Sequence, residues 1–467
     1  MNGGMLMGLI ALLSLSALYV YARPHVVLAR GVALLTLLLS LMATARSMFG
    51  STPAQPSELL VTDELSALFM PLTALVACAV LFGAPLRELS GPTLASVLLS
   101  LAAAIGAYCA RDLTVFTAAW LLGLFAIGLA LPLGHARLAV AYKSYGALGT
   151  LPLLIAVVIL YRAHDSSFAP SSAATNGLPV GTQHLVFFLL SMAAAFRSGL
   201  LPLHSWLPAI TARAPVSTSA MIFGAQLGPI LVARGIVPLT PLVAQSDLSP
   251  VALWAVISAL YAGVLGLVQT DLKRTLGFVL TSQSALLLFG VSGADPESMH
   301  GALLGISALG LTGTGLLLIA GALEERTGTS DLVKLRGRGL AFPRMTALFF
   351  LFSAASIGVP GTLPFVSEDL LLHGLLRVNP LGAMILLLAN VLNGITLLKT
   401  FFQVFQGPTR ARKTERRSDL TTREATIIAG LLVATVLTGL SPQILLALQD
   451  HSVRALEAGE ISKLESH

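Results

Sequence analysis

The amino-acid sequence predicts an all-α, polytopic membrane protein, and three observations support this fold class. Of the 467 residues, 55% are hydrophobic and only 11% are charged, whereas soluble proteins carry about 25% charged residues. The mean hydropathy is +0.85. Apolar runs of about 20 residues, the length that crosses a bilayer as a helix, recur along the chain. We therefore expect the chain to fold with the lipid bilayer as its main surroundings.

About fourteen apolar segments are long enough to span a bilayer, if interrupted segments are counted loosely. The first segment lacks a basic region and a clear cleavage motif, so we expect a retained helix rather than a signal peptide. The predicted spans lie near residues 4–22, 27–44, 64–84, 92–110, 113–133, 143–161, 183–199, 216–236, 249–269, 275–292, 299–322, 342–359, 365–376 with 380–403, and 425–447.

Basic residues in short loops indicate the orientation of the chain. Arg23 and Arg30 flank the first turn, and residues 410–424 form the most basic stretch. Because cytoplasmic loops carry an excess of Lys and Arg, we expect both on the cytoplasmic side and the N-terminus outside. The net charge of +6 fits such loops and calls for no nucleic acid. Docking to lipid headgroups or to a partner is the alternative role of the basic stretch.

An interrupted transmembrane helix is predicted at residues 197–234. Three prolines fall within residues 202–215, too close for one regular helix, because each lacks an N–H and clashes with the preceding turn. Apolar runs on both sides keep the segment in the membrane, where broken backbone is tolerated only if protein or a water-filled cavity satisfies it. Arg197 and His204 lie at this break, and ionisable groups at such depth indicate function.

A second interruption is predicted at residues 357–373, where two prolines flank a glycine. Glu368, Asp369 and His373 follow in an apolar context. Paired interrupted segments in the two halves of a membrane protein are typical of inverted repeats that meet at a central ion site. The symmetry is visible in the layout of the sequence rather than in residue identities.

Titratable groups inside the bundle are candidates for a proton path. The guanidinium of Arg197 does not release its proton, so it would fix a charge, bind an anion or cap broken backbone. His204 titrates near neutral pH, or else hydrogen-bonds to backbone at the bridge. Lys273 lies with Asp271 in a charged turn, for which a plain loop is the alternative.

Lys399 lies deep in the predicted span 380–403, where a lysine is costly, and snorkelling to the interface is its alternative. Glu368 follows the second break directly. The proton-path candidates are Arg197, His204, Lys273, Glu368, His373 and Lys399, with Asp271 and Asp369 as supporting residues.

No pattern for a cofactor or metal ion occurs in the sequence. The two cysteines, Cys78 and Cys109, lie in apolar runs and form no CxxC pair. There are no paired axial haem ligands and no glycine-rich phosphate loop in a strand–helix context. We expect the chain itself to hold no cofactor and no metal.

Three motifs carry a family resemblance. FRSGLLPLHSWLPAITARAPVSTSAMI (196–222) resembles KSxxxPFHxWLPxAxxxAPxPVSAxIH, QTDLKRTLGFVLTSQSA (269–285) resembles QxDxKRxxAYSSxSxxG, and IGVPGTLPFVSED (357–369) resembles LGxPGxxGFxxE. These are patterns of the antiporter-like proton-channel membrane subunits of respiratory complex I and of the related Mrp antiporters. The last span also resembles the C-terminal segment of one branch of these subunits.

The resemblance implies a fold of fourteen helices, built from two inverted five-helix repeats that each contain a broken helix. It also implies work inside a larger complex that moves H⁺ or Na⁺ along a central hydrophilic axis. In the relatives, an acid in the fifth span pairs with a lysine at the first break. On this basis we divide the chain into N-terminal helices (1–110), an antiporter-like core (111–404), a basic cytoplasmic loop (405–424), a last transmembrane helix (425–447) and a polar tail (448–467).

Three positions depart from the family pattern. Leu121 stands where the resemblance places the acid, Arg197 replaces the lysine, and Phe223 replaces a histidine. Only Gln226 offers a polar group near Phe223, and we add it to the supporting residues. Without a carboxylate partner, Arg197 cannot take part in the family's pairing. We therefore expect at most one working half-channel, in the second half of the chain.

Four functions are compatible with these features. The first is a membrane subunit of a complex I-like assembly, of the NADH-quinone oxidoreductase or hydrogenase type, which couples a soluble redox partner to ion movement. The second is the membrane subunit of an inorganic-carbon uptake complex, paired with a zinc hydratase-like protein. The third is an Mrp-type cation/proton antiporter subunit, and the fourth is a non-conducting scaffold. Each implies other membrane subunits as partners and a multi-pass position in a bacterial-type inner membrane.

Overall fold

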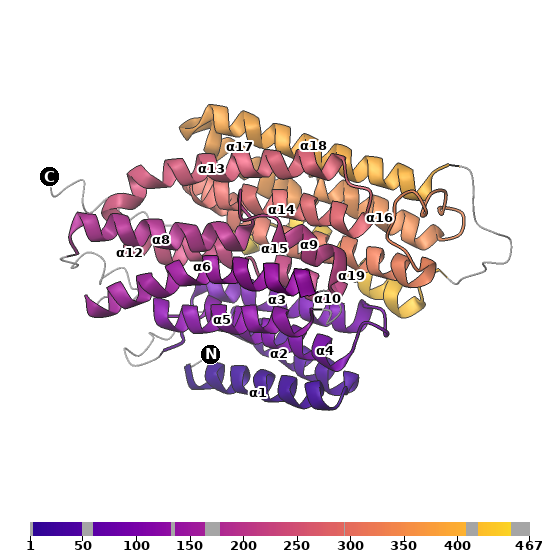
Figure 1. Cartoon of the computed structure of the whole chain (residues 1–467), viewed down its shortest axis with the longest axis horizontal. Helices are drawn as coiled ribbons and strands as arrows, with labels where there is room; N and C mark the ends of the chain where they lie inside the picture. The colour runs from indigo at the N-terminus through magenta and orange to yellow at the C-terminus, as the bar shows by residue number, and fades with distance from the viewer. Residues whose placement is uncertain are drawn as a thin grey trace.

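The computed structural model describes residues 3–48, 59–131, 136–163, 178–293, 295–407 and 419–449. Most of the predicted basic loop and nearly all of the predicted polar tail lie outside these residues. Within the described part, all named elements are helices, and they run roughly parallel to the long axis of the molecule (Figure 1). The all-α membrane fold predicted from composition is therefore confirmed.

The first half of the chain begins at one edge of the bundle with α1 and moves inward (Figure 1). Its helices are α1 (Gly3–Ala22), α2 (Val26–Met48), α3 (Glu64–Gly83), α4 (Gly91–Tyr108), α5 (Leu113–Leu129), α6 (Ala136–Arg162), α8 (Val180–Ser198), α9 (Trp206–Arg213), α10 (Val216–Gly224), α11 (Leu227–Leu231), the π-helical turn η1 (Val232–Ile236) and α12 (Val237–Leu239).

The second half reaches the opposite edge at α17 and α18, and its last helix returns to pack against α3 and the centre of the bundle (Figure 1). Its helices are α13 (Pro241–Leu267), α14 (Leu272–Val291), α15 (Pro296–Thr327), α16 (Pro343–Ser356), α17 (Leu363–Val378), α18 (Pro380–Phe405) and α19 (Thr422–Leu440).

Every predicted span coincides with one of these helices or with a group of them. Among the described residues, 12 helices are both long and apolar enough to cross a membrane. The shorter α5, α16 and α17, of 17, 14 and 16 residues, fall below that length. The count of fourteen therefore stays a prediction, since it depends on how the short helices are paired.

The first predicted break is confirmed between α8 and α9. Gly199 ends α8 in the left-handed region, with φ of 71°, which glycine adopts without steric cost. The bridge that follows is held by α13, because Leu201 N donates to Ser258 Oγ at 3.1 Å and Trp254 Nε1 donates to Leu201 O at 2.5 Å. Side chains of a neighbouring helix thus satisfy the broken backbone, as the membrane requires.

A further break, between α10 and α11, was not predicted. The sequence favours one continuous span over 216–236, but Gln226 adopts φ 15° and ψ 55°, outside the helical region. Pro229 lacks the N–H that would bond to the carbonyl of Ala225, and Tyr108 OH donates to that carbonyl instead, at 2.9 Å. The predicted span is therefore present, at residues 216–239, but it is interrupted at Gln226, where a tertiary contact replaces the helical hydrogen bond.

The second predicted break is confirmed between α16 and α17. Helix α16 ends at Ser356, and the connection contains Gly358 and Gly361 with φ of 81° and 91°. Each half of the chain thus contains a helix, a short bridge with a left-handed glycine at or near its start, and a second helix. This layout agrees with two repeats, and their inverted relation stays a prediction.

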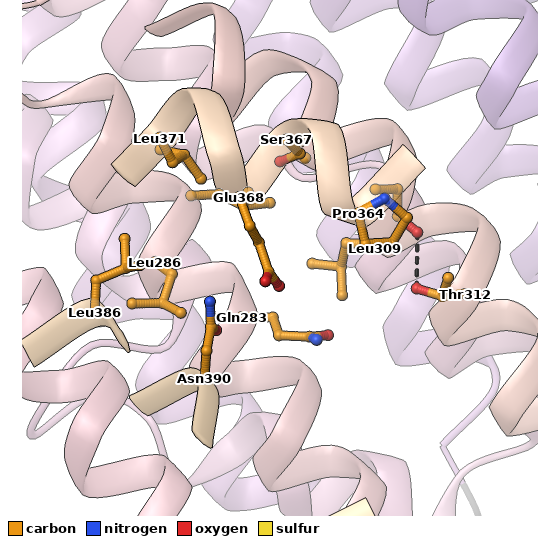
Figure 2. Close-up of a pocket in the computed structure, with 13 residues that line it drawn as sticks. Gln283, Leu286, Leu309, Thr312, Pro364, Ser367, Glu368, Leu371, Leu386 and Asn390 are labelled. Atoms are coloured by element: carbon orange, nitrogen blue, oxygen red, sulfur yellow. Dashed lines mark hydrogen bonds between the residues drawn. The ribbon is translucent and has the colours of Figure 1, made fainter. Parts of the chain in front are cut away.

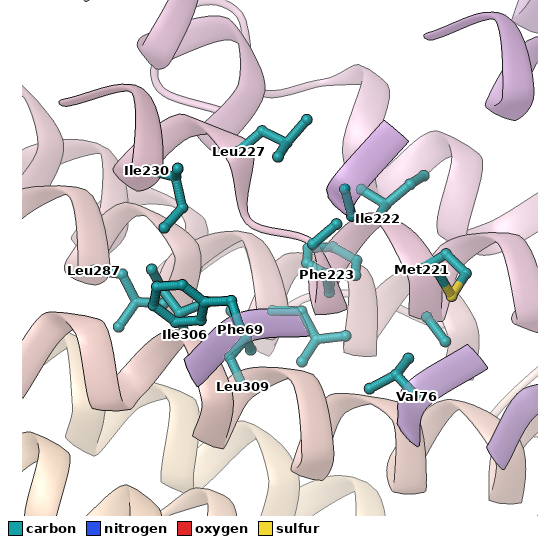
Figure 3. Packing of buried hydrophobic residues seen from close by; sticks show 14 of the residues in the cluster. Phe69, Val76, Met221, Ile222, Phe223, Leu227, Ile230, Leu287, Ile306 and Leu309 are labelled. Atoms are coloured by element: carbon teal, nitrogen blue, oxygen red, sulfur yellow. The ribbon is translucent and has the colours of Figure 1, made fainter. Parts of the chain in front are cut away.

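Helix α15 forms the centre of the bundle, and its apolar window is wholly buried. It packs against helices of both halves, including α3, α10, α14 and α17. Figure 3 shows the apolar cluster around it, with Phe69 and Phe223 lying near Ile306 and Leu309. Phe223 is 1% exposed, so this departure from the family pattern places a packing residue in the core.

Candidate functional site

A partly open cavity lies beside Glu368, on the first turns of α17 after the second break. The cavity has about 40 Å³ open to the centres of water molecules, and its polar lining includes Gln283, Thr312 and Asn390. A single water needs about 10–15 Å³ measured in this way, so the cavity has room for about three. Figure 2 shows the carboxyl group of Glu368 extending into the cavity, toward Gln283 and Asn390.

The second break makes room for this carboxyl group. A Cβ atom on Gly358 would lie 2.7 Å from Glu368 Oε2, so the carboxylate in its present position lies directly against this glycine, whose φ of 81° favours glycine in any case. Within the part of the chain that the structure describes, Glu368 has no ion-pair partner. A carboxyl group among amides, hydroxyls and water can accept and release a proton, which is the chemistry that proton transfer requires.

Gln283 connects the cavity to the end of α16. Its Nε2 donates to Ser356 O at 3.1 Å and to Ser356 Oγ at 2.9 Å, and it thereby satisfies the backbone freed at the break. Its Oε1 is buried without a partner among the described residues. This oxygen can therefore accept a hydrogen bond from water in the cavity that Glu368 also lines.

A separate set of polar contacts joins α14 to the break at Gln226. Ser284, next to Gln283, donates to Gln226 Oε1 at 2.7 Å, and Gln226 Nε2 donates to Phe223 O at 3.2 Å. Gln226 occupies the break that the sequence did not reveal. These side-chain contacts between α14 and the break thus consist of a hydroxyl and an amide, which hold their charge state at any physiological pH.

Arg197 lies near the same break, in a small pocket that Ala225 and Leu227 also line, and is 7% exposed. Its guanidinium carbon is 5.9 Å from the centre of the Trp120 ring, within range of a cation–π contact. Leu121, the position of the family's acid, is 42% exposed. Among the described residues, no carboxylate forms an ion pair with Arg197, so the structure agrees with the departures noted in the sequence.

Two other candidates lie away from the cavity. Lys399 is exposed, and its Nζ donates to Leu267 O, the last carbonyl of α13, at 2.7 Å. His204 packs edge-on against Tyr261, with ring centres 5.2 Å apart, and its Nδ1 is buried without a hydrogen-bond partner among the described residues. Lys399 thus caps a helix, while His204 belongs to the bridge of the first break.

The other candidate residues on α17 and at the start of α14 also lie outside the cavity that Glu368 lines. The ring Nδ1 of His373 lies 2.8 Å from Asp369 O and 3.4 Å from Asp369 Oδ1, and both side chains are exposed. Asp271 caps α14 by accepting a hydrogen bond from Arg274 N at 2.8 Å. Neighbours in sequence therefore have different positions, because successive helical residues point to different faces.

Lys273 is not part of a solvated loop. It is 4% exposed, and its Nζ lies 3.0 Å from Glu324 Oε2 and 3.3 Å from Ala214 O. The alternative of a plain charged turn is therefore wrong for this residue. Its acidic partner was missed because 51 residues separate the two in sequence, and only the meeting of α14 with α15 brings them together.

Glu88, in the connection between α3 and α4, was also missed. Its Oε2 accepts a hydrogen bond from Val216 N, the first residue of α10, at 3.0 Å. Together with Lys273, which donates to Ala214 O, it holds both sides of the connection between α9 and α10. A second ion pair at this end of the bundle joins Arg326 to Glu424 at 2.5 Å.

The stability of the protein is expected to fall as pH rises through neutrality because of Glu88. Burial raises the pKa of this carboxyl group from 4.5 to about 7, against the opposing charge of Lys273, and the carboxylates of Glu324 and Glu325 add to the increase. The folded state then binds a proton more tightly than the unfolded chain. The stabilisation is present below pH 4.5 and is lost as the pH rises through about 7.

Glu88→Gln is expected to remove this dependence. Between pH 5 and pH 8 the unmodified protein should lose about 2 kcal/mol of stability that the variant keeps. The free energy of unfolding of the variant, relative to that of the unmodified protein, should therefore increase by this amount over the same range. Denaturant titrations of both proteins at each pH measure the difference. Parallel pH profiles for the two proteins would show that Glu88 does not titrate in this range.

Among the described residues, no group of three or more His, Cys, Asp or Glu side chains is arranged to hold a metal ion. The titratable groups of the bundle interior instead lie singly, as Glu368 and His204 do, or in ion pairs at its ends, as Lys273 does with Glu324.

Comparisons with known proteins agree with this architecture. Residues 134–394 match the family described as NADH:quinone oxidoreductase/Mrp antiporter, transmembrane. NADH-quinone oxidoreductase subunit M of Rickettsia bellii is 27% identical over 321 residues, which cover 68% of this chain and 65% of that protein. NAD(P)H-quinone oxidoreductase chain 4 2 of Synechococcus sp. (strain JA-3-3Ab) is 30% identical over 371 residues, which cover 76% of this chain and 69% of the relative.

A solved structure extends the likeness to nearly the whole chain. A chain of respiratory complex I from Thermus thermophilus with bound NADH superposes with a TM-score of 0.85 at 25% identity, and covers 96% of this chain and 99% of its own length. The matched family segment contains both breaks and the cavity at Glu368. The chain belongs to the NADH:quinone oxidoreductase/Mrp antiporter transmembrane family.

Proposed function

We propose that this chain is a membrane subunit of a complex I-like assembly, of the NADH-quinone oxidoreductase or hydrogenase type, and that it takes part in H⁺ (or Na⁺) translocation. The observation that carries this proposal is the carboxyl group of Glu368 in a partly open cavity with room for water, at a break in the membrane-embedded backbone. Intramembrane carboxyl groups in such surroundings are typical of ion and proton pathways.

Translocation in this proposal uses the second half of the chain. Glu368 exchanges protons with water in its cavity, and Gln283 and Asn390 orient that water. The first half contributes coupling and structure rather than conduction, since Arg197 has no carboxylate partner in the described residues and Gln226 and Ser284 do not titrate. The subunit therefore has one working half-channel.

The assembly follows from the same proposal. Residues 111–404 form the antiporter-like core, preceded by the N-terminal helices and followed by a basic cytoplasmic loop. The chain lies in a bacterial-type inner membrane beside other membrane subunits, and a soluble redox protein drives ion movement. A zinc hydratase-like soluble partner would instead indicate inorganic-carbon uptake, and small membrane partners alone would indicate an Mrp-type antiporter.

Purification through a tag on the full chain tests the function directly. We expect mass spectrometry of the purified complex to find iron–sulfur or quinone-site subunits, and the complex reconstituted in liposomes to acidify one side during redox turnover. Acidification that disappears when an uncoupler is added results from proton movement across the membrane. Protons that the redox reaction itself releases would persist. A complex that contains redox subunits and turns over without any ion movement would contradict the proposal.

Lys399→Ala is expected to leave ion movement per turnover unchanged. The lysine is exposed and caps α13 at Leu267 O, outside the cavity that Glu368 lines. A local decrease in the stability of the helix end is the only expected effect. The measurement is proton movement per electron in reconstituted complexes, and a loss of coupling in this variant would add Lys399 to the path.

A further inference from the structure

The buried cation of Arg197 is the most unusual electrostatic feature of the bundle. Its side chain is 7% exposed, and its Nη1 has no hydrogen-bond partner among the described residues. Trp120 faces the guanidinium at 5.9 Å, but a ring face compensates only a small part of the cost of burying a charge. Because a guanidinium remains charged in proteins, this cost persists at every physiological pH.

The titratable groups with which Arg197 interacts do not neutralise it. They are the hydroxyl groups of Tyr108 and Tyr142. Tyr108 OH donates its proton to Ala225 O at 2.9 Å, and Tyr142 OH donates to Leu124 O at 2.7 Å. Each of these donors is a neutral phenol, so the described residues leave one uncompensated positive charge at this site.

A small cavity lies against the guanidinium. It has about 10 Å³ open to the centres of water-sized spheres, which is space for about one such particle. Ser100 of α4 lines it and is 7% exposed, with an Oγ that has no partner among the described residues. Two nine-tenths buried hydrogen-bond donors, one cationic and one neutral, thus line the same cavity.

The other residues that line the cavity limit how large an anion can be and how many hydrogen bonds it can receive. Ala103, Ile127, Met221 and Leu227 make most of the wall apolar. An oxyanion such as bicarbonate or phosphate is larger than the cavity and needs several donors, which this wall lacks. Among anions, a monatomic halide is the nearest in size to the single water-sized particle that the cavity holds, requires few donors and restores neutrality beside Arg197.

We propose that Arg197 and Ser100 bind one small monatomic anion, of the chloride class, in the first half of the bundle. The anion takes the electrostatic role of a carboxylate that this chain lacks at α5. The bound pair is neutral and does not exchange protons at physiological pH. This site is independent of the proposed function of Glu368, because its occupancy does not require any ion movement through the second half.

Thermal unfolding of the full chain, purified with its bound subunits, tests the site. Chloride replaces gluconate in steps at constant ionic strength, and no redox substrate is present. We expect a saturable rise in melting temperature of about 3 °C, because a ligand that binds only the folded state stabilises it. Bromide should act like chloride, and sulfate and bicarbonate at equal ionic strength should not.

Three variants assign the effect to this cavity. Arg197→Gln should abolish the chloride dependence, and Ser100→Ala should raise the half-saturating chloride concentration about tenfold, as expected for a lost donor. Arg213→Gln, which changes an exposed arginine near the same break, should respond like the unmodified protein. If Arg197→Gln does not yield folded protein, Ser100→Ala decides the question with the same readout.

Crystals of the complex grown in bromide give an independent measurement. We expect one anomalous peak between the guanidinium of Arg197 and the hydroxyl of Ser100. No chloride dependence in the unmodified protein, an unchanged half-saturating concentration in Ser100→Ala, or a bromide peak elsewhere only would overturn the proposal. Because all of these measurements are made without turnover, their outcome is separate from the test of Glu368.

Discussion

Glu368→Gln is expected to lower proton movement per electron at least about tenfold in the reconstituted complex. Glutamine has nearly the same shape and fills the same cavity beside Gln283 and Asn390, so packing and water content should be retained. Its amide does not titrate, however, and the one carboxyl group that the described residues contribute to the cavity lining would be lost. The measurement is the pH change inside liposomes, divided by the rate of redox turnover.

Asp369→Asn is the matched control for this prediction. It removes a carboxylate from the next residue of the same helix, which is exposed and lies 3.4 Å from the ring of His373. Proton movement per electron should stay at the unmodified level in this variant. Equal losses in both variants would indicate a general effect of charge on α17, and unchanged movement in Glu368→Gln would remove the second half-channel from the proposed function.

Lys273→Met is expected to lower the free energy of unfolding by about 2 kcal/mol. The substitution keeps the volume of the buried stem but leaves Glu324 and Glu88 without their cation, and it frees the carbonyl of Ala214. Breaking a fully buried pair costs more than this, but the Glu324 side chain is 34% exposed, and water compensates part of the loss. Denaturant titration of the full chain measures the change.

A double-mutant cycle isolates the ion pair itself. Lys273→Met combined with Glu324→Gln should cost less than the sum of the single changes, because the double variant buries no unpaired charge. Lys334→Met is the control, since this lysine is exposed and lies 4.0 Å from its partner Asp331. Additive effects in the cycle would show that Lys273 acts through packing alone.

Much of the fold follows from local properties of the sequence. Apolar runs of membrane-spanning length predicted each long helix. In lipid, a single segment can form all of its backbone hydrogen bonds internally only as a helix. Proline and glycine clusters predicted the breaks at residues 199–205 and 357–362, because these residues act on the backbone beside them. The position of Glu368 just after a break was likewise sufficient to single it out.

Properties that depend on contacts between distant residues were not predictable in this way. The break at Gln226 depends on Tyr108, more than one hundred residues earlier, which donates to the freed carbonyl of Ala225. Lys273 looked like a loop residue until α15 brought Glu324 to it. Lys399 looked deeply buried from its place in a span, yet it lies on an exposed face of α18 and caps α13.

The sequence by itself therefore determined the membrane class, the helices and both bridged breaks, since these are set by residue type and spacing along the chain, while the family resemblance indicated the missing carboxylate near Arg197. Only the tertiary structure decided which charges meet, which stay unpaired and where water has room. Pairing energies and cavities depend on distances across helices that the order of residues does not specify. Glu368 in its cavity and Arg197 without an acid belong to this second kind of information.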